Sequence, residues 1–340
     1  MKNNAVKKIK FSIVLLNYNG EYWITKCLES IKNQSFKDFE VIFVDNGSID
    51  NSIHKALEIY PALKLCPIFP NIGYCVGNNV GANFAVGEWL ILLSNDTWIE
   101  KDFLKELSEH DLYNTSHIFV PKVLQYEENF DDRGQIGFIQ DVLSYGIAVD
   151  NAEPFWCLGC AFVIRRSEFF LLGGFDENYF AFHEDLDLSW RAQLFGMTVT
   201  GAPGARVHHY GGGTFGKAKI VNGKAETTSI RRYLGERNRL TTLLKNYSLY
   251  SLIIVIPILL IQTLIAMLLA IIFRQSQITE IYVKSYLWNI KNIRKILSAR
   301  KIIQAVRTRN DLYIMKKHYI GLIEVQRFLK VGFPSINKSQ

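Results

Sequence analysis

The sequence predicts an α/β protein with a largely parallel sheet, followed by a helical region that associates with a membrane. Three observations support this prediction. Apolar runs of strand length alternate with helical patterns over residues 11–93, and polar residues directly follow three of these runs. An uncharged apolar run then covers residues 249–273 and opens a basic C-terminal part.

The alternation of strands and helices begins near the N-terminus. Residues 11–17 and 40–45 are almost continuously apolar, as in strands that are buried on both faces of a parallel sheet. Residues 21–35 carry apolar side chains at helical spacing, and residues 52–60 form a second helix candidate. This order predicts βαβ units with right-handed crossovers. Further strands are predicted at 63–69, 89–93 and 161–165.

Asp45 ends the second predicted strand, within the sequence Asp45-Asn46-Gly47-Ser48. Ligands of parallel sheets bind beyond the carboxyl ends of the strands, where an acidic residue can accept hydrogen bonds from a ribose or a base N–H group. The Asn-Gly pair forms a turn that leaves backbone amides free for phosphates. The same four residues are also ordinary turn chemistry, so both readings stay open here.

A second carboxylate, Asp96, follows the apolar strand at 89–93 and the pair Ser94-Asn95. A divalent cation that bridges a diphosphate takes one or two oxygen ligands from the protein and the rest from phosphate and water. Asp96 suits that role. It would equally suit the N-cap of a helix that begins at Trp98.

Three carboxylates stand within four positions at Glu184, Asp185 and Asp187. They repel one another unless a cation or a proton intervenes, and one with a raised pKa could act as a general base. Arg191 lies four residues beyond Asp187 and could pair with it on a helix. The alternative is an acidic first turn that complements a helix dipole.

Adjacent histidines, His208 and His209, precede three glycines, and either could complete a metal site. Cys157 and Cys160 form a C-x-x-C sequence without a second pair, which favours a structural role over a zinc site. Five cysteines fit a reducing compartment, and no apolar run at the start is long enough for a signal peptide. We therefore expect the first part of the chain to be cytosolic.

The net charge of +7 is unevenly distributed. Residues 1–216 hold 17 Lys and Arg against 27 Asp and Glu, whereas residues 217–340 hold 22 against 5. The basic part calls for an anionic partner, either nucleic acid or lipid. Since no nucleic-acid motif is present and an apolar run adjoins, anionic lipid is favoured.

Residues 249–273 are long enough to span a membrane. Lys and Arg flank both sides of the run, and the positive-inside rule would keep both flanks cytoplasmic. A re-entrant or in-plane helix, broken at Pro257, satisfies both flanks. Residues 280–330 predict basic amphipathic helices on the membrane surface, with a solvated helix packed on the first domain as the alternative.

Read in order, these motifs resemble those of family 2 glycosyltransferases, inverting enzymes of GT-A fold that use nucleotide-diphospho-sugars. The resemblance is strongest to the rhamnosyltransferase-like branch and covers about residues 9–245. It rests on the strand 12–17 with Tyr18-Asn19, on VDNGSID around Asp45, on residues 71–81, and on GGFDENYF followed by EDLDLSWR.

The resemblance implies a role for each motif. Asp185 takes the position of the catalytic base, with Glu184 beside it, and Asp45 that of the residue at the nucleotide base. Asp96 and His209 would hold a divalent metal, Mg²⁺ or Mn²⁺, with His208 as the fallback. Ser94 stands where the D-x-D motif has its first carboxylate, so only the last Asp is kept. Further donor contacts are implied for Asn17, Asn19, Asn71, Gly73, Asn78 and Asn95, and acceptor or diphosphate contacts for Asp187, Trp190, Arg191 and Thr214.

The expected protein is thus a GT-A enzyme with a Rossmann-like mixed sheet. It would move a sugar, dTDP-rhamnose being one candidate donor, to a lipid-linked glycan at the cytosolic membrane face. A membrane-bound nucleotidyltransferase and a non-enzymatic lipid-binding adaptor are the alternatives. The expected segments are a basic lead (1–8), the catalytic domain (9–216), a basic linker (217–248), the membrane segment (249–273) and a basic helical tail (274–340).

Overall fold

In the computed structural model, residues 9–109, 117–127, 134–150, 153–213, 216, 219–221 and 224–337 are described. The basic lead and Thr214 lie outside them. The chain divides into two compact units. Unit 1 comprises residues up to 137, 150–180 and 198–210, and unit 2 comprises residues 138–149, 181–197 and 211 onward. The segment boundaries expected from the sequence stay predictions.

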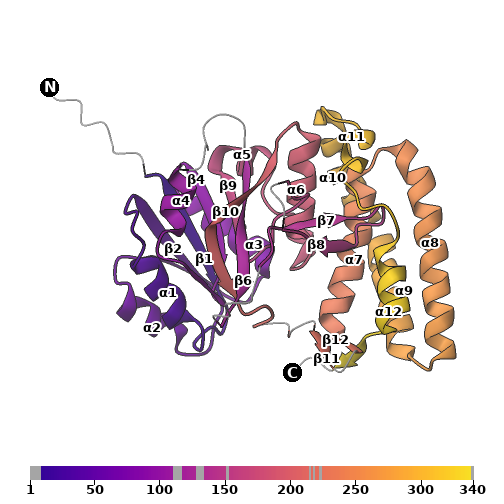
Figure 1. Ribbon diagram of the computed structural model, residues 1–340, viewed down its shortest axis with the longest axis horizontal. Coiled ribbons are helices and arrows are strands. Elements are labelled where there is room, and N and C mark those ends of the chain that lie inside the picture. Colours follow the sequence, from indigo (N-terminus) through magenta and orange to yellow (C-terminus); the bar gives the residue numbers. More distant parts are fainter. Residues whose placement is uncertain are drawn as a thin grey trace. The chain divides into compact units, whose positions relative to one another are not determined.

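Unit 1 is built on an eight-stranded mixed sheet (Figure 1). Its strand order is β3-β2-β1-β4-β9-β6-β10-β5; β9 runs antiparallel to β4 and β6, and β5 antiparallel to β10. The other pairs are parallel. The strands are β1 (Phe11–Asn17), β2 (Phe39–Asn46), β3 (Lys64–Ile68), β4 (Trp89–Ser94), β5 (Thr97–Ile99), β6 (Ile118–Gln125), β9 (Ala161–Arg165) and β10 (Val199–His209).

Helices cover both faces of this sheet because alternate residues of each strand point to opposite sides. Phe11, Ile13 and Leu15 of β1 join a core with the apolar side of α1, whereas Val14 lies beneath α3. Each fully buried aliphatic side chain contributes about 1.5–3 kcal/mol. The helices are α1 (Ile24–Lys32), α2 (Ser52–Ile59), α3 (Tyr74–Phe84), α4 (Phe103–Glu109), α5 (Arg166–Leu171) and the 3-10 helix η1 (Glu177–Tyr179).

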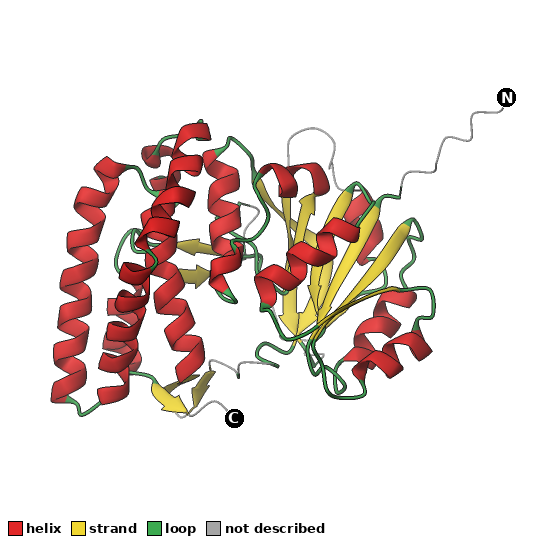
Figure 2. Cartoon of the chain, turned by 180° about the vertical axis from the view of Figure 1, so that it is seen from behind, coloured by secondary structure: helices red, strands yellow, loops and turns green. Residues whose placement is uncertain are grey.

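Unit 2 is mostly helical, as Figure 2 shows. Its central helix, α7 (Ser229–Asn246), buries charged side chains, among them Glu236 and Arg239, which pair with each other. The other helices are α6 (Glu184–Leu194), α8 (Leu249–Ile272), α9 (Ser276–Lys291), α10 (Ile293–Val306), α11 (Asp311–Met315) and α12 (Ile323–Val331). Short strands complete it: β7 (Phe138–Gln140), β8 (Gly146–Ala148), β11 (Lys219–Val221), β12 (Lys224–Thr228) and β13 (Ser335–Asn337).

Two local predictions were wrong. Asp96 does not cap a helix, because the chain continues into β5, which pairs with β10. Pro257 does not break the apolar segment, because α8 runs through it without interruption. The predicted helical character of residues 280–330 is confirmed by α9 to α12.

Candidate active site

The carboxyl ends of β1 and β2 are joined by a buried polar network in unit 1. The Nδ2 group of Asn17 donates to Asp45 Oδ1 at 3.1 Å and to Ser52 Oγ at 2.8 Å. The other Asp45 oxygen accepts from the backbone N–H of Ser48 at 3.1 Å. Asn17 and Ser52 are fully buried and Asp45 is 3% exposed. The sheet thus places these polar side chains at the edge where parallel sheets bind ligands.

The loops above this network are fixed by further side chain to backbone bonds. Asn19 Oδ1 accepts from the N–H of Ile49 at 2.9 Å, and Ser48 Oγ accepts from the N–H of Asn19 at 2.9 Å. These reciprocal bonds lock the loop after β1 to the loop after β2. Gly20 belongs to the same arrangement, since an added Cβ would lie 2.0 Å from Asn95 Nδ2.

The turn before α3 holds a second group of predicted donor residues. Asn46 Nδ2 donates to Asn71 Oδ1 at 3.0 Å and to the carbonyl of Gly73 at 3.1 Å. Gly73 has φ +92°, and a Cβ there would meet the ring of Phe180 at 2.6 Å, so this position needs glycine. Asn78 lies buried within α3 and donates to the carbonyl of Tyr74 at 3.0 Å.

Asp96 and His209 come together although they are more than a hundred residues apart. His209 Nε2 lies 3.4 Å from Asp96 Oδ1, and Asn95 Nδ2 donates to Asn17 Oδ1 at 2.7 Å. Burial by itself would lower the pKa of His209, but the neighbouring Cys160 and Asp96 outweigh it and raise this pKa to about 10. Together the antiparallel pairing of β5 with β10 and the end of β4 create this pair.

This pair fits a divalent cation. It offers one hard carboxylate and, 3.4 Å away, one imidazole nitrogen that binds a cation once it has lost its proton, and it leaves further positions for phosphate oxygens and water. Within the described ranges no group of three or more His, Cys, Asp or Glu side chains could hold a metal. The cation would therefore depend on its diphosphate ligand as much as on Asp96 and His209.

His208, the fallback ligand, is engaged elsewhere. Its ring stacks on Trp98 with centroids 3.6 Å apart, Nδ1 lies 2.8 Å from the carbonyl of Gln125, and Nε2 lies 3.2 Å from Glu100 Oε1. Both ring nitrogens thus have protein partners. This arrangement favours His209 over His208 as the ligand.

The acidic segment of unit 2 forms the first turn of α6, and its three carboxylates have different environments. Asp187 is fully buried and bonds to Arg191 Nε at 2.9 Å, which confirms the pairing predicted from the i, i+4 spacing. Trp190 is also fully buried and packs edge-on against Tyr247, with centroids 4.8 Å apart. These contacts place Asp187, Trp190 and Arg191 in the interior of unit 2, and their predicted acceptor or diphosphate roles stay predictions.

Glu184 and Asp185 differ in exposure. Glu184 is 6% exposed, and its Oε2 has no hydrogen-bond partner among the described residues. Burial, and then the adjacent Asp185 charge, raise the pKa of Glu184 well above its usual value. Asp185 is half-buried, and its Oδ1 accepts from the N–H of Leu186 at 2.7 Å. The raised pKa thus belongs to Glu184, while Asp185 is the more exposed of the two, and the predicted role of Asp185 as the base stays a prediction.

Comparison with known proteins identifies the domain that contains Asn17, Asp45 and Asp96. Residues 12–175 match the sequence model of the family described as glycosyl transferase family 2. Residues 12–175 form a family 2 glycosyltransferase domain. This identity agrees with the expected enzyme class and removes the support for the nucleotidyltransferase and adaptor alternatives.

Two relatives show what this chain is similar to. It is 24% identical over 260 residues to N-acetylglucosaminyl-diphospho-decaprenol L-rhamnosyltransferase of Mycobacterium tuberculosis, covering 66% of this chain and 84% of that protein. It is 29% identical over 122 residues to glycosyltransferase GlyA of Streptococcus pneumoniae, covering 35% of this chain and 18% of that one. The chain thus spans less than a fifth of GlyA.

A solved structure confirms the GT-A fold of the family 2 domain. The crystal structure of GalNAc-T7 with UDP, GalNAc and Mn²⁺ aligns with a TM-score of 0.58 and 16% sequence identity. The alignment covers 72% of this chain and 49% of the other. At this identity the likeness shows the fold alone.

Sequence reasoning missed several residues that shape these sites. Lys245 Nζ lies 3.1 Å from Asp187 Oδ1, and Asn246 Nδ2 donates to the same oxygen at 3.1 Å. Asn238 of α7 bonds to the turn that precedes α6. Neither contact follows a short sequence spacing, so no local signal pointed to it.

Proposed function

We propose that this chain is an inverting glycosyltransferase that moves a sugar from a nucleotide-diphospho-sugar onto a lipid-linked glycan at the cytosolic face of a membrane. The observation that carries the proposal is the family 2 domain, in which strand ends bring Asn17 to Asp45, together with the contact of its Asp96 with His209 of β10. Among the similar proteins is a rhamnosyltransferase named for a lipid-linked acceptor, so dTDP-rhamnose is the first donor to test.

In the proposed reaction, Asp185 accepts the proton of an acceptor hydroxyl. The hydroxyl oxygen forms a bond to the anomeric carbon while the bond from that carbon to the diphosphate oxygen breaks, so the configuration inverts and the nucleoside diphosphate leaves. Asn17 and Asp45 orient the nucleoside, and Asp96 and His209 would hold a divalent cation. When bound, this cation supplies neutralisation of the diphosphate charge.

Membrane attachment is proposed for α8. Within the described part of the chain it is the one helix that is long and apolar enough to cross a membrane, and the mean hydropathy of its most apolar 18 residues is 2.9. Only 22% of the most apolar 18 residues of α8 is buried, whereas the core helix of a soluble domain would be mostly buried. Its outward side is apolar along the whole length, at Tyr250, Ile253, Ile254, Leu260, Ile261, Leu264, Ile265, Leu268, Ile271 and Ile272.

The contacts of α8 within unit 2 support an in-plane attachment. At its start, the Ser251 hydroxyl donates to Asp311 Oδ2 at 2.5 Å, and Asp311 pairs with Arg307. In its second half, Thr263 Oγ1 lies 2.8 Å from the hydroxyl of Tyr286, and near the end Ala270 packs in a cluster with α9. Figures 1 and 2 show α8 running beside α9 at the edge of unit 2. A helix held along one side by a folded unit can offer only its other side to lipid.

A donor screen tests the proposed activity. Full-length protein in membrane vesicles is mixed with a polyprenyl-diphosphate-GlcNAc acceptor, Mg²⁺ or Mn²⁺, and dTDP-rhamnose, UDP-GlcNAc, UDP-galactose or a GDP-sugar in turn. Mass spectrometry should detect the acceptor extended by one sugar with one donor class, and the anomeric configuration of the new bond should be opposite to that of the donor. No transfer from any donor with wild-type protein, or transfer with retention, would contradict the proposal.

A further inference from the structure

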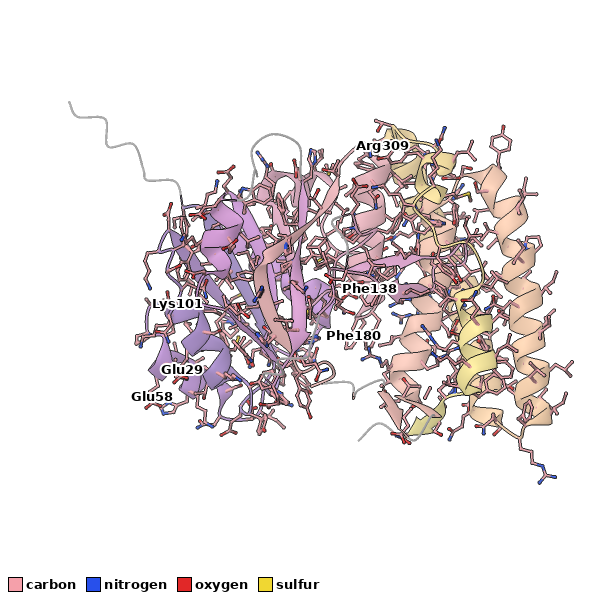
Figure 3. All side chains as sticks on the ribbon, viewed as in Figure 1. Glu29, Glu58, Lys101, Phe138, Phe180 and Arg309 are labelled. Atoms are coloured by element: carbon pink, nitrogen blue, oxygen red, sulfur yellow. The ribbon has the colours of Figure 1, made fainter. Side chains whose placement is uncertain are left out.

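A short left-handed segment leads directly into the acidic helix α6. Phe180, Phe182 and His183 have φ of +64°, +67° and +68°. Residues other than glycine rarely adopt this region, and such strain persists only where the surroundings enforce it. Figure 3 labels Phe180, where the segment begins.

The residue at the end of this segment, His183, makes no side-chain capping bond to the helix that follows. It occupies the N-cap position of α6 in a left-handed conformation. The helix starts with the N–H of Asp187 donating to the carbonyl of His183 at 2.8 Å. The direction of the first turn, which carries Asp185, therefore depends on what holds residues 181–183.

Asn238 provides that hold from the middle of α7. Its Nδ2 group donates to the carbonyl of Ala181 at 2.8 Å and to the carbonyl of Phe182 at 2.7 Å. Its Oδ1 accepts from Arg237 Nε at 2.8 Å, which fixes which way the amide faces. Asn238 is fully buried, so water cannot replace these bonds. A carboxamide is the side chain that supplies two donors to adjacent carbonyls and an acceptor besides.

We propose that Asn238 is a positioning residue that holds the left-handed turn 181–183 and thereby sets the direction of Asp185. The inference rests on the proposed function, because Asp185 matters for turnover only if it is the base. Asn238 bonds to the backbone of the turn and would act through it. Its contribution is to keep the acidic turn in the one geometry in which Asp185 can take a proton.

The test compares two buried asparagines. Asn238→Asp keeps the shape but removes both donors, and we expect kcat to fall about 30- to 100-fold, the order of loss that a 1 Å misplacement of a catalytic group brings. The dissociation constant of the nucleotide-sugar should stay within a factor of two, since Asn17, Asp45 and Asp96 belong to unit 1.

Asn289→Asp is the matched control. Asn289 is 2% exposed, and its Nδ2 donates to the carbonyls of Arg237 at 3.0 Å and Ser285 at 2.9 Å, so the change removes the same kind of bonds away from the turn. We expect both variants to lower Tm, but only Asn238→Asp to lower kcat. Equal losses of kcat in the two variants, or a normal kcat in Asn238→Asp, would overturn the inference.

A readout that needs no turnover separates this inference from the proposed function. Hydrogen–deuterium exchange of the amides of residues 184–188 should become at least tenfold faster in Asn238→Asp and stay unchanged in Asn289→Asp. If the aspartate variant does not fold, Asn238→Ser, which keeps one donor, should show a smaller rise. Unchanged exchange in both Asn238 variants would refute the positioning role even if wild-type transfer were absent.

Discussion

The ammonium group of Lys245 lies 3.1 Å from Asp187 Oδ1, and both side chains are buried in unit 2. Arg191 bonds to the other oxygen of Asp187, and Asn246 bonds to the same oxygen as Lys245. One carboxylate of α6 thus joins two cations, one from its own helix and one from the end of α7. Asp187 is fully engaged in this network, which distinguishes it from the more exposed Asp185.

Replacing the carboxylate of this network should destabilise unit 2. Asp187→Asn leaves Lys245 and Arg191 buried without a counter-charge, and breaking a buried pair in this way costs about 3–5 kcal/mol. Chemical denaturation should therefore show a clearly lower midpoint. Glu280→Gln, which removes an exposed pair with Lys284, should leave the midpoint unchanged. A stable but inactive Asp187→Asn protein would instead point to a direct role in the reaction.

Replacing each of the two adjacent carboxylates of α6 by its amide should affect kcat differently. Asp185→Asn should lower kcat about 10²- to 10⁴-fold, the usual contribution of a general base, with little change in donor affinity. Glu184→Gln should keep kcat within about tenfold of wild type, because burial disfavours the charged form of Glu184 and a neutral amide of the same shape suits that site. Steady-state kinetics and donor titration calorimetry measure both. The reverse order of losses would make Glu184 the base.

Donor binding should depend on a divalent cation held by Asp96 and His209. In calorimetry with Mn²⁺, Asp96→Ala and His209→Ala should each weaken donor binding about 10- to 100-fold, whereas without the cation they should bind the donor about as weakly as wild type does. His54→Ala, which alters an exposed histidine, is the control. Equal weakening with and without Mn²⁺ would mean that the pair serves the protein structure alone.

Much of unit 1 could be predicted from local pattern. Apolar runs identify β1, β2 and β9 because strands buried on both faces leave a strong local signal. The helix α3 was missed because its Asn- and Gly-rich sequence has low helix propensity. Close packing explains its presence: a Cβ at Gly81 would lie 2.4 Å from Val14, so glycine allows α3 to approach the sheet.

Contacts within the site could be predicted from the sequence only where the two residues are a few positions apart in the chain. The pairing of Arg191 with Asp187 follows the i, i+4 rule, whereas Lys245 reaches the same carboxylate from a different helix. Similarly, the choice of His209 over His208 depends on how β10 pairs with β5, since neighbouring residues of a strand face opposite ways. Such contacts depend on the register of distant segments, which composition and periodicity do not contain.

A buried histidine should make unit 2 sensitive to acid. Burial lowers the pKa of His318 from 6.5 to about 4, and its Nε2 lies 3.0 Å from Gln140 Nε2. Because the unfolded chain takes up the proton near pH 6.5 and the folded state only near pH 4, the stability from this group is present above pH 6.5. It is lost as the pH falls from 6.5 to 4. Tm measured from pH 7.5 to 4.5 should fall less steeply in His318→Gln than in wild type, whereas the exposed His54→Gln should follow wild type.

The outward side of α8 should decide lipid binding. Ile254→Glu together with Ile261→Glu places two charges on that side, at residues 64% and 58% exposed, so folding should be little affected. Flotation with vesicles that contain anionic phospholipid should recover wild-type protein and lose most of the double variant, because burying an unpaired carboxylate in lipid is costly. The matched control, Ile254→Leu with Ile261→Leu, should float like wild type.

Cysteine labelling in intact cells distinguishes a helix α8 that lies in the plane of the membrane from one that crosses it. Ser298→Cys places a thiol at an exposed position after α8. This thiol should stay unlabelled from outside if α8 lies in the plane, whereas labelling would show that the helix crosses the membrane.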